Sequence, residues 1–317
     1  MPGSFARHTE SWEITSQADI ASKQSKGWQS VQTSADNQLY VAASLPDALA
    51  ALAERGWEGA PLAGGTWIMR AQLRGETSRP AYVHIGRVDA LRAIEIGDTD
   101  LRIGAGATHA ELTRFLLAHP EFRALMQAAG NSANPQVRNM ATIGGNLCAA
   151  DFAAADLVPA LLCLEAEVEL ESHMGRLERM PLPAFLALRG NVGRGMLLTH
   201  ILVPRRCRRS AHVRLPLRKA GDYPVAIVSL SCALADDGSF CDPRIAVGSV
   251  DRQATRWHGL EEKLAGTPLD PAAAAAAAAE VVGGLTARDG VEAPGWYRLQ
   301  VLPALVRRAA EEIRRSV

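Results

Sequence analysis

The chain is predicted to be an α+β protein, and two observations carry this prediction. Helical apolar spacing and strand-like apolar runs alternate along the sequence, but short turns that suit antiparallel hairpins join several of the strand runs. The second observation is a glycine pattern, because Gly104-x-Gly106-x-x-His109 lacks the third glycine of the dinucleotide fingerprint. The phosphate-binding pattern G-x-x-x-x-G-K-[ST] does not occur either. A doubly wound parallel sheet is therefore not expected.

Capping residues predict two helix starts in the first half of the chain. Ser44 is followed by apolar residues at helical spacing and then by Gly56, so a helix is expected between these two positions. Thr108 is a candidate N-cap for a later helix, with the acidic Glu111 in its first turn. The other elements expected in this half are strands over 60–63, 82–85, 91–96 and 100–103 and helices over 110–118 and 121–129.

The second half begins with an apolar run over 157–164 and continues mainly as strands. A third structural unit is expected to start near Val213. In that unit, Asp270 and Pro271 open an Ala-rich helix as its cap and its first residue. The other elements expected in this half are strands over 165–171, 197–203, 225–234 and 244–249 and a final helix over 301–313.

Composition limits the possible classes of function. The chain has 317 residues and 48% hydrophobic content, enough for two or three compact units with real cores. Its 34 Lys and Arg residues balance 34 Asp and Glu residues, whereas a nucleic-acid-binding protein is normally basic. No run reaches about 18 strongly apolar residues, so no membrane span is expected. The polar segment 1–37 lacks export-signal features and is interpreted as a mobile or partner-wrapping arm.

The five cysteines argue for a reducing compartment, and a cytoplasmic location is the simplest interpretation. An odd count without a C-x-x-C pair fits neither a disulfide framework nor an iron–sulfur cluster within this chain. The eight histidines show no paired metal-binding spacing, so no metal site is expected. The one dense basic run, 205–209, is either a solvated loop or a dock for an acidic partner or a nucleotide phosphate.

Two glycine pairs are the most informative local feature. The segments 62–66 (Leu-Ala-Gly-Gly-Thr) and 142–146 (Thr-Ile-Gly-Gly-Asn) each hold Gly-Gly flanked by a threonine and an apolar residue. Glycine lets successive backbone N–H groups face outward without a Cβ in the way, and such nests bind anions such as a pyrophosphate. Two nests suggest one dinucleotide held from two sides. For 62–66 taken alone, a strand-to-helix turn that needs glycine is the simpler interpretation.

The longer context of these pairs resembles a known family. Residues 137–146 (Val-Arg-Asn-Met-Ala-Thr-Ile-Gly-Gly-Asn) are similar to the second flavin motif of the FAD-binding subunit of the molybdenum hydroxylases, and 63–66 to its first. This subunit is the medium subunit of the xanthine dehydrogenase and carbon monoxide dehydrogenase family. Trp-Tyr-Arg at 296–298 and Arg-Arg-Ala at 307–309 are similar to its C-terminal helix. The resemblance runs from about Tyr40 to the end of the chain.

The resemblance implies a two-subdomain FAD-binding fold of the PCMH/vanillyl-alcohol-oxidase type. A C-terminal α+β domain like that of the CO dehydrogenase flavoprotein follows it. The expected division is a flexible N-terminal arm over 1–37, FAD-binding subdomain 1 over 38–97, FAD-binding subdomain 2 over 98–210 and the C-terminal domain over 211–317.

The resemblance also implies a set of FAD-binding residues. Trp67 stands where the family commonly has an Asp, and its indole either stacks near the flavin or fills a core. Asn146 bonds the pyrophosphate or closes its loop, and Ser132 lies beside the flavin or is a plain loop residue. The residues assigned to FAD binding are Leu62, Ala63, Gly64, Gly65, Thr66, Trp67, Ser132, Thr142, Ile143, Gly144, Gly145, Asn146, Asp156, Leu198 and Lys219.

Asp156 is assigned through a shift of one residue. The family usually has an Asp nine residues after its motif Asn, where this chain has Ala155 followed by Asp156, with Asp151 also near. A carboxylate suits ribose hydroxyls because it can accept from two donors, but Asp156 is equally a candidate helix N-cap. Leu198 and Lys219 match positions that pack on and hydrogen-bond the flavin, although Lys219 is otherwise a solvated side chain.

The activity that the resemblance implies is electron transfer through FAD. Electrons come from [2Fe-2S] clusters of a small partner subunit, while a molybdopterin-binding large subunit oxidises the substrate; a dimer of such heterotrimers is a further possibility. No residue of this chain is assigned a catalytic or metal-binding role. Two other classes stay open: a self-sufficient FAD-dependent oxidoreductase with its own small organic substrate, and a scaffold that has lost its flavin. The substrate and the final acceptor (NAD, oxygen, a quinone or another carrier) do not follow from the sequence.

Overall fold

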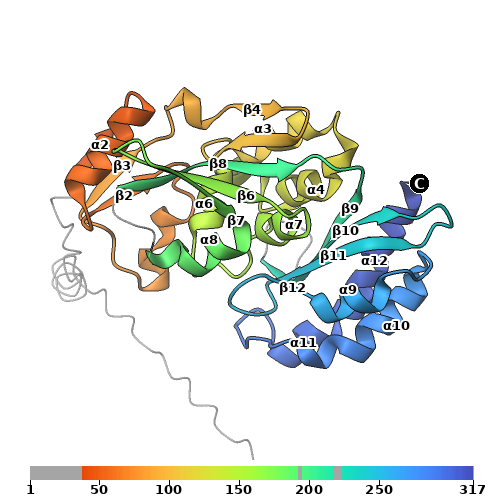
Figure 1. Ribbon diagram of the computed structural model, residues 1–317. Coiled ribbons are helices and arrows are strands. Elements are labelled where there is room, and N and C mark those ends of the chain that lie inside the picture. The colour runs from red at the N-terminus through yellow and green to blue at the C-terminus, as the bar shows by residue number, and fades with distance from the viewer. Residues whose placement is uncertain (1–37, 192–194, 218–222, 317) are drawn as a thin grey trace, which may run out of the picture. The chain divides into compact units, whose positions relative to one another are not determined.

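The computed structural model describes residues 38–191, 195–217 and 223–316 (Figure 1). Within these residues the strands form three sheets, of three, five and four strands. Helices pack on all three sheets, and the two larger sheets are antiparallel, so the predicted α+β class is confirmed. No described helix is long and apolar enough to cross a membrane. The segment 1–37 and Lys219 lie outside the described residues.

The first sheet is parallel, with the strand order β1-β3-β2. Helix α2 (Leu45–Arg55) packs against it and begins as predicted, because the Ser44 hydroxyl caps the amide of Asp47 and Gly56 ends the helix at φ 52°. The strands are β1 (Gln38–Val41), β2 (Gly59–Leu62) and β3 (Ala81–His84), and the 3₁₀ turns around them are η1 (Ile68–Arg70), η2 (Gln72–Arg74) and η3 (Asp89–Leu91).

The second sheet is antiparallel, with the order β4-β5-β8-β6-β7. One hydrophobic core lies between this sheet and helices α3, α4, α6, α7 and α8. Thr108 forms the predicted cap as a full capping box with Glu111. The strands are β4 (Ile94–Ile96), β5 (Asp100–Gly104), β6 (Glu167–Ser172), β7 (Leu177–Pro181) and β8 (Met196–Pro204). The helices are α3 (His109–Leu116), η4 (Pro120–Phe122), α4 (Arg123–Asn131), α5 (Pro135–Arg138), α6 (Ile143–Cys148), α7 (Leu157–Cys163), α8 (Leu182–Leu188) and η5 (Arg189–Asn191).

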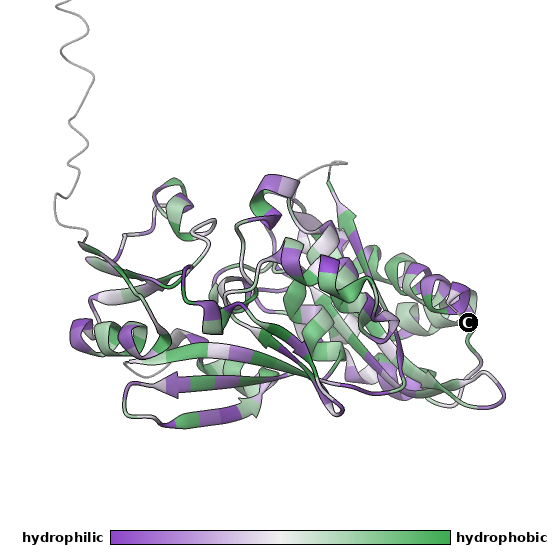
Figure 2. Cartoon of the chain, turned by 90° about the horizontal axis from the view of Figure 1, so that it is seen from above, coloured by the Kyte–Doolittle hydropathy of each residue, from purple (hydrophilic) through white to green (hydrophobic). Residues whose placement is uncertain are grey.

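The third sheet has the order β12-β11-β10-β9 and is covered on both faces. Helices α9, α10 and α12 share one core with it, while α4 and α7 of the preceding region pack on its other face. Helix α12, which ends at the label C in Figure 2, carries both hydrophobic and hydrophilic residues along its length. The elements are β9 (Arg209–Pro216), β10 (Pro224–Leu234), β11 (Phe240–Gly248), β12 (Thr255–Arg256), α9 (His258–Leu264), α10 (Pro271–Val281), η6 (Val282–Gly284), α11 (Gly295–Gln300) and α12 (Leu302–Arg315).

Several predicted elements differ in type or extent. The apolar run at 157–164 is helix α7, buried throughout because it lies between the second and third sheets. Leu91 belongs to a 3₁₀ turn and not to the strand predicted over 91–96, which is shorter. The segment 134–148 contains two short helices, α5 and α6, although no helix was predicted there. The domain limits stay a prediction.

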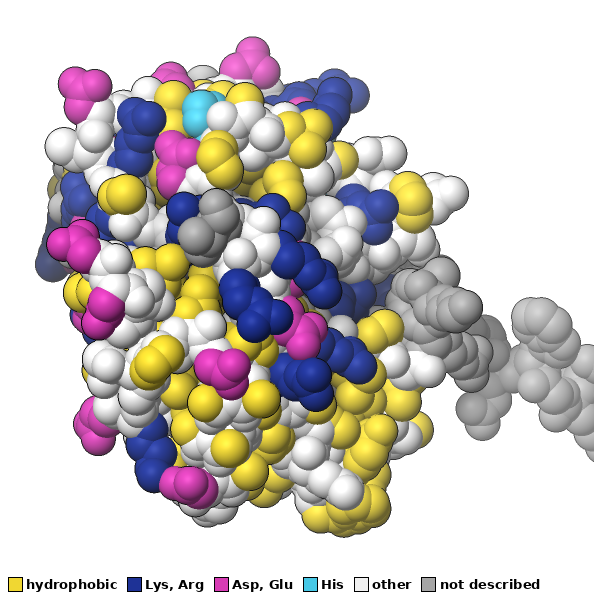
Figure 3. All heavy atoms as spheres, turned by 90° about the vertical axis from the view of Figure 1, so that its right-hand side faces the viewer, with side chains coloured by type: hydrophobic (Ala, Val, Ile, Leu, Met, Phe, Trp, Pro, Cys, Tyr) yellow, Lys and Arg dark blue, Asp and Glu magenta, His cyan; other side chains and the backbone are white. Residues whose placement is uncertain are grey.

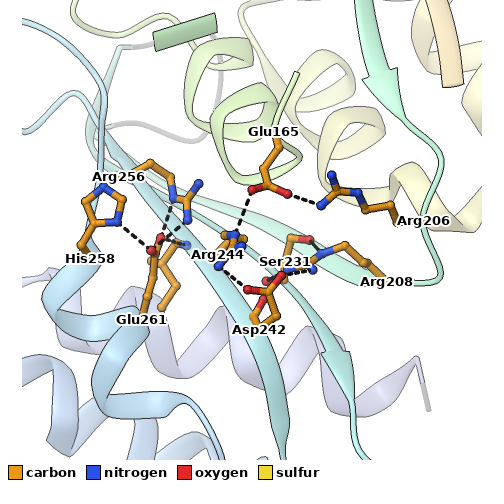
Figure 4. Close-up of polar contacts among 10 residues, drawn as sticks. Glu165, Arg206, Arg208, Ser231, Asp242, Arg244, Arg256, His258 and Glu261 are labelled. Atoms are coloured by element: carbon orange, nitrogen blue, oxygen red, sulfur yellow. Dashed lines mark hydrogen bonds and ion pairs between the residues drawn. The ribbon is translucent and has the colours of Figure 1, made fainter. Parts of the chain in front are cut away.

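The basic run at 205–209 is paired within the chain. Arg206 contacts Glu165 after helix α7, and Arg208 Nη1 lies 2.8 Å from Asp242 Oδ2 on β11 (Figure 4). The remaining contacts are Arg205 with Glu121 and Arg209 with the carbonyl of Ser316. Basic and acidic side chains are interspersed over the face drawn in Figure 3. The run therefore joins the region around the second sheet to the third sheet, and it is not an open anion dock.

Glu261→Gln is expected to destabilise the fold at neutral pH but not in acid. Burial opposes ionisation of this carboxyl, yet hydrogen bonds from Arg256 and from the amide of Ile245, together with His258, outweigh burial and lower its pKa (Figure 4). Such a carboxylate stabilises the folded state above its unfolded pKa, and the contribution is lost as pH falls through the folded pKa.

Thermal unfolding of the wild type and Glu261→Gln at about pH 7 and at an acid pH below the folded pKa of Glu261 measures this difference. The exposed neighbour Glu262 supplies the control substitution Glu262→Gln, which should be neutral at both pH values. An equal loss of stability for Glu261→Gln at both pH values would contradict the prediction.

Candidate functional site

A cavity of about 670 Å³ is lined by residues from all three sheets and their loops. Most of the residues predicted to bind a cofactor line it together, although they come from distant parts of the sequence. They are Ala63, Gly64, Gly65, Thr66, Trp67, Ser132, Thr142, Gly144, Gly145, Asn146, Asp156 and Leu198. Leu62 ends β2 just outside the lining, and Ile143 is fully buried in the core beneath it.

The first glycine pair follows strand β2 and is in backbone contact with the second motif. A Cβ on Gly64 would lie 1.7 Å from the carbonyl oxygen of Met140, so only glycine permits this approach. Gly65 has φ +70°, the left-handed region that favours glycine. Among the described residues, no acceptor is bonded to the amides of Gly64, Gly65 and Thr66. This pair therefore matches the predicted anion nest.

The second glycine pair starts helix α6 and is not an open nest. The Thr142 hydroxyl caps α6 by accepting from the amide of Gly145, at 3.1 Å. The amides of Ile143 and Gly144 donate to the carbonyls of Ala107 and Ala105. Most backbone donors of this motif are thus already used, which corrects the prediction of two equivalent nests. Its glycines serve close packing, because a Cβ on Gly144 would lie 2.7 Å from the Cβ of Ala105.

An aromatic cluster forms part of the cavity wall. The rings of Trp67 and Phe152 lie 4.5 Å apart, and Tyr223 meets Phe152 edge-on at 5.4 Å. The guanidinium of Arg74 lies over the indole ring, 3.7 Å from its centre. Trp67 therefore contacts two side chains at the cavity and does not fill one of the three cores.

The lining of the cavity carries more basic than acidic residues. Among the described residues they are four arginines and a single carboxylate, Asp156. Arg70, Arg79 and Arg189 donate to the Tyr223 hydroxyl or to backbone carbonyls, and no described carboxylate lies at ion-pair distance from these three. Burial lowers the pKa of Arg189, so an anion nearby would stabilise its charged form. The cavity is therefore suited to an anionic ligand.

Asp156 stands at the first turn of α7 but does not cap it with its side chain. Its Oδ1 is buried, 3.1 Å from Arg214 Nε and 3.6 Å from His212 Nε2, at distances of ion pairs without hydrogen-bond alignment. Asp156 lines the cavity beside these two basic side chains. The alternative residue, Asp151, is exposed and does not line the cavity.

Sequence reasoning missed several lining residues. His109 and Phe152 stand beside predicted features, since His109 follows the N-cap Thr108 and Phe152 precedes Asp156. Arg189 and Tyr223 carry no sequence signal, because their approach to the cavity depends on how distant elements pack. Leu198, which was predicted, lies on β8 and is buried at the cavity wall.

Comparison with known proteins decides the family. The profile described as the FAD binding domain in molybdopterin dehydrogenase matches residues 32–206, more than half of the chain, and the CO dehydrogenase flavoprotein C-terminal domain matches residues 211–313. The chain belongs to the FAD-binding subunits of the molybdenum hydroxylase family. The predicted family, fold and FAD cofactor are thereby confirmed, and the chain is an oxidoreductase subunit.

Relatives of this FAD-binding subunit cover most of its length. It is 34% identical over 272 residues to the 6-hydroxypseudooxynicotine dehydrogenase complex subunit alpha of Paenarthrobacter nicotinovorans, spanning 84% of this chain and 91% of the relative. It is 30% identical to the xanthine dehydrogenase FAD-binding subunit of Escherichia coli O157:H7, over 86% and 94% of the two chains. A structure of reconstituted CO dehydrogenase from Oligotropha carboxidovorans superposes with a TM-score of 0.79 at 26% identity, covering 89% and 98%.

The residues of this FAD-binding subunit fit the cofactor. The cavity volume lies within the range of about 300–1,000 Å³ typical of ligand pockets. The free amides of the first glycine pair and the arginines without carboxylate partners suit a pyrophosphate. Buried polar atoms of His109 and Asn146 in the lining, Nε2 and Oδ1, have no hydrogen-bond partner among the described residues. A polar ligand would supply those partners.

Gly64→Ala is expected to abolish FAD binding or weaken it strongly, because the added methyl group would force the two motifs apart at their backbones. Flavin content of the purified protein and titration with FAD measure the effect. Gly259→Ala is the control, since a Cβ on Gly259 would lie in open space, outside the cavity lining. Wild-type affinity in Gly64→Ala would show that the contact with Met140 is dispensable.

Proposed function

We propose that this chain is the FAD-carrying electron-transfer subunit of a multi-subunit molybdenum hydroxylase. It receives electrons from [2Fe-2S] clusters of a small partner subunit and passes them to an external acceptor, while a molybdopterin-binding large subunit oxidises the organic substrate. The observation that supports this most directly is the cavity, which combines free amides, arginines without carboxylate partners and one described carboxylate in a chain of this family.

The chain's own residues have three tasks in this proposal. The amides of Gly64, Gly65 and Thr66 hold the pyrophosphate, and the neighbouring arginines balance its charge. The carboxylate of Asp156 would accept hydrogen bonds from hydroxyls of the adenosine ribose. Leu198 and the aromatic cluster supply the apolar wall that excludes water. A flavin contact of Lys219 stays a prediction.

When bound, FAD supplies a centre that accepts electrons singly and passes them on in pairs. The protein orients it and sets the charge around it. Among the described residues there is no group of three or more His, Cys, Asp or Glu side chains that could hold a metal ion. We assign the metal centres to the partner subunits, as the resemblance implies.

Co-expression with a molybdopterin-binding subunit and a [2Fe-2S] subunit from the same genome tests the proposed function. We expect the three subunits to co-purify and the complex, but not this chain alone, to oxidise an organic substrate. The isolated chain should still pass electrons from an artificial donor to an acceptor. Turnover of a small organic substrate by the isolated chain, with FAD as its only cofactor, would favour the self-sufficient oxidoreductase instead.

Deletion of residues 1–37 is expected to weaken assembly more than flavin content. The polar segment is expected to become ordered when it binds a partner, which costs conformational entropy at that step. Its deletion should therefore change the stability of the complex. Size-exclusion chromatography of the three subunits and the flavin-to-protein ratio are the two measurements. A loss of flavin with unchanged assembly would contradict the expectation.

Asp156→Asn is expected to weaken FAD binding by about 1–3 kcal/mol, the usual effect of leaving a buried hydrogen-bonding group unmatched. The matched control is Asp151→Asn, at an exposed residue outside the cavity lining, which should bind FAD like the wild type. Titration of the apoprotein with FAD measures both. If Asp151→Asn weakens FAD binding and Asp156→Asn does not, the adenosine contact lies at Asp151.

A further inference from the structure

His109 forms a buried pair with Ser132 at the cavity wall. The imidazole is only 2% exposed, and its Nδ1 lies 2.7 Å from the hydroxyl oxygen of Ser132. The same hydroxyl lies 2.9 Å from the carbonyl oxygen of Ala129. Both His109 and Ser132 line the cavity. The pair joins the start of helix α3 to the end of helix α4.

The hydrogen-bond chain fixes which ring nitrogen of His109 carries the proton. A serine hydroxyl has one proton, and a carbonyl oxygen can only accept, so Ser132 donates to Ala129. The Ser132 oxygen must then accept from His109, which places the imidazole proton on Nδ1. Burial, reinforced by Arg138 and opposed by Asp156, lowers the pKa of His109 to about 4, so the ring is neutral at physiological pH. Nε2 is therefore a bare acceptor.

No described residue donates to Nε2 of His109, although the atom is buried. A buried acceptor without a donor is unfavourable, and native structures rarely keep one unless water or a ligand completes it. The position of His109 indicates the ligand part nearby. Its amide donates to the carbonyl of Ala141, and the preceding Thr108 pairs with Thr142, so His109 lies directly beside the second motif.

We propose that Nε2 of His109 accepts a hydrogen bond from a sugar hydroxyl of FAD, and that Ser132 positions the ring for this contact. This inference rests on the proposed FAD site. A pyrophosphate has no donor at neutral pH, whereas the groups attached to it on both sides carry hydroxyls. The ribityl chain and the adenosine ribose share this chemistry, and the experiment separates them.

Titration of the apoprotein with FAD is the first measurement, on wild type and His109→Phe. Phenylalanine keeps a ring of similar size and removes the acceptor, so we expect FAD affinity to fall about tenfold to a hundredfold. Ser132→Ala frees the ring to move its proton to Nε2 and should also weaken binding. Adding Ser132→Ala to His109→Phe should cause little further loss, because both act through one hydrogen bond.

Thr199→Val is the matched control. It removes a buried side-chain hydrogen bond, from Thr199 to the carbonyl of Glu169, at a residue that does not line the cavity. Its FAD affinity should equal that of the wild type. FAD analogues that lack single hydroxyls then identify the donor. With the analogue lacking the contacted hydroxyl, on the ribityl chain or on the ribose, His109→Phe should no longer change the affinity.

The ¹⁵N NMR signals of the His109 ring provide a readout that a purely structural role would not change. In the wild-type protein we expect Nδ1 protonated in both states and the Nε2 signal to shift when FAD binds. Wild-type affinity in His109→Phe, or an unchanged Nε2 signal in the wild type, would overturn the proposal while leaving FAD binding intact. A wild-type apoprotein that binds no FAD would instead overturn the proposed function itself. If His109→Phe does not fold, the wild-type NMR measurement decides.

Discussion

The contact between the backbones of Gly64 and Met140 is the constraint on which the rest of the cavity depends. A side chain at Gly64 would collide with the Met140 carbonyl, so the first motif can lie directly on the second only without a Cβ. Gly144 is constrained in the same way, because a Cβ there would collide with Ala105, which directly follows strand β5. The two motifs and the second sheet thus stack through backbone. The amides of the first motif have no described acceptor, whereas those of Ile143 and Gly144 in the second are bonded to carbonyls that follow strand β5.

The third sheet and its loops contribute residues to the cavity wall. Strand β10 is buried over most of its length, since α4 and α7 cover one face of the sheet and C-terminal helices cover the other. Arg214 on β9 and Tyr223 before β10 both line the cavity, yet both lie outside the segment matched by the FAD-binding profile. Arg214 also lies against Asp156. The C-terminal domain therefore positions a side chain that the FAD-binding region supplies.

The fold could be predicted from the sequence where the signal is local. Ser44, Thr108 and Asp270 cap helices as expected, because a cap depends on a few neighbouring residues. The run at 157–164 could not be assigned in this way, since a helix buried on all sides has no apolar period to reveal it. The same limit applies to the site. The glycine pairs can be recognised in the sequence. The arginines and aromatic residues of the cavity wall are brought together only by tertiary packing.

Arginine shows this limit most clearly. The dense run at 205–209 attracts attention in the sequence, yet its arginines are paired with Glu121, Glu165 and Asp242 or with a backbone carbonyl. Arg70, Arg79 and Arg189 are scattered through the sequence, and among the described residues they have only neutral acceptors. A chain of zero formal charge thus places unbalanced positive charge in one cavity by pairing its conspicuous basic residues elsewhere. In this chain, the dense run of basic residues in the sequence forms ion pairs that hold the fold together. The cavity is marked instead by arginines that have no described carboxylate partner in space.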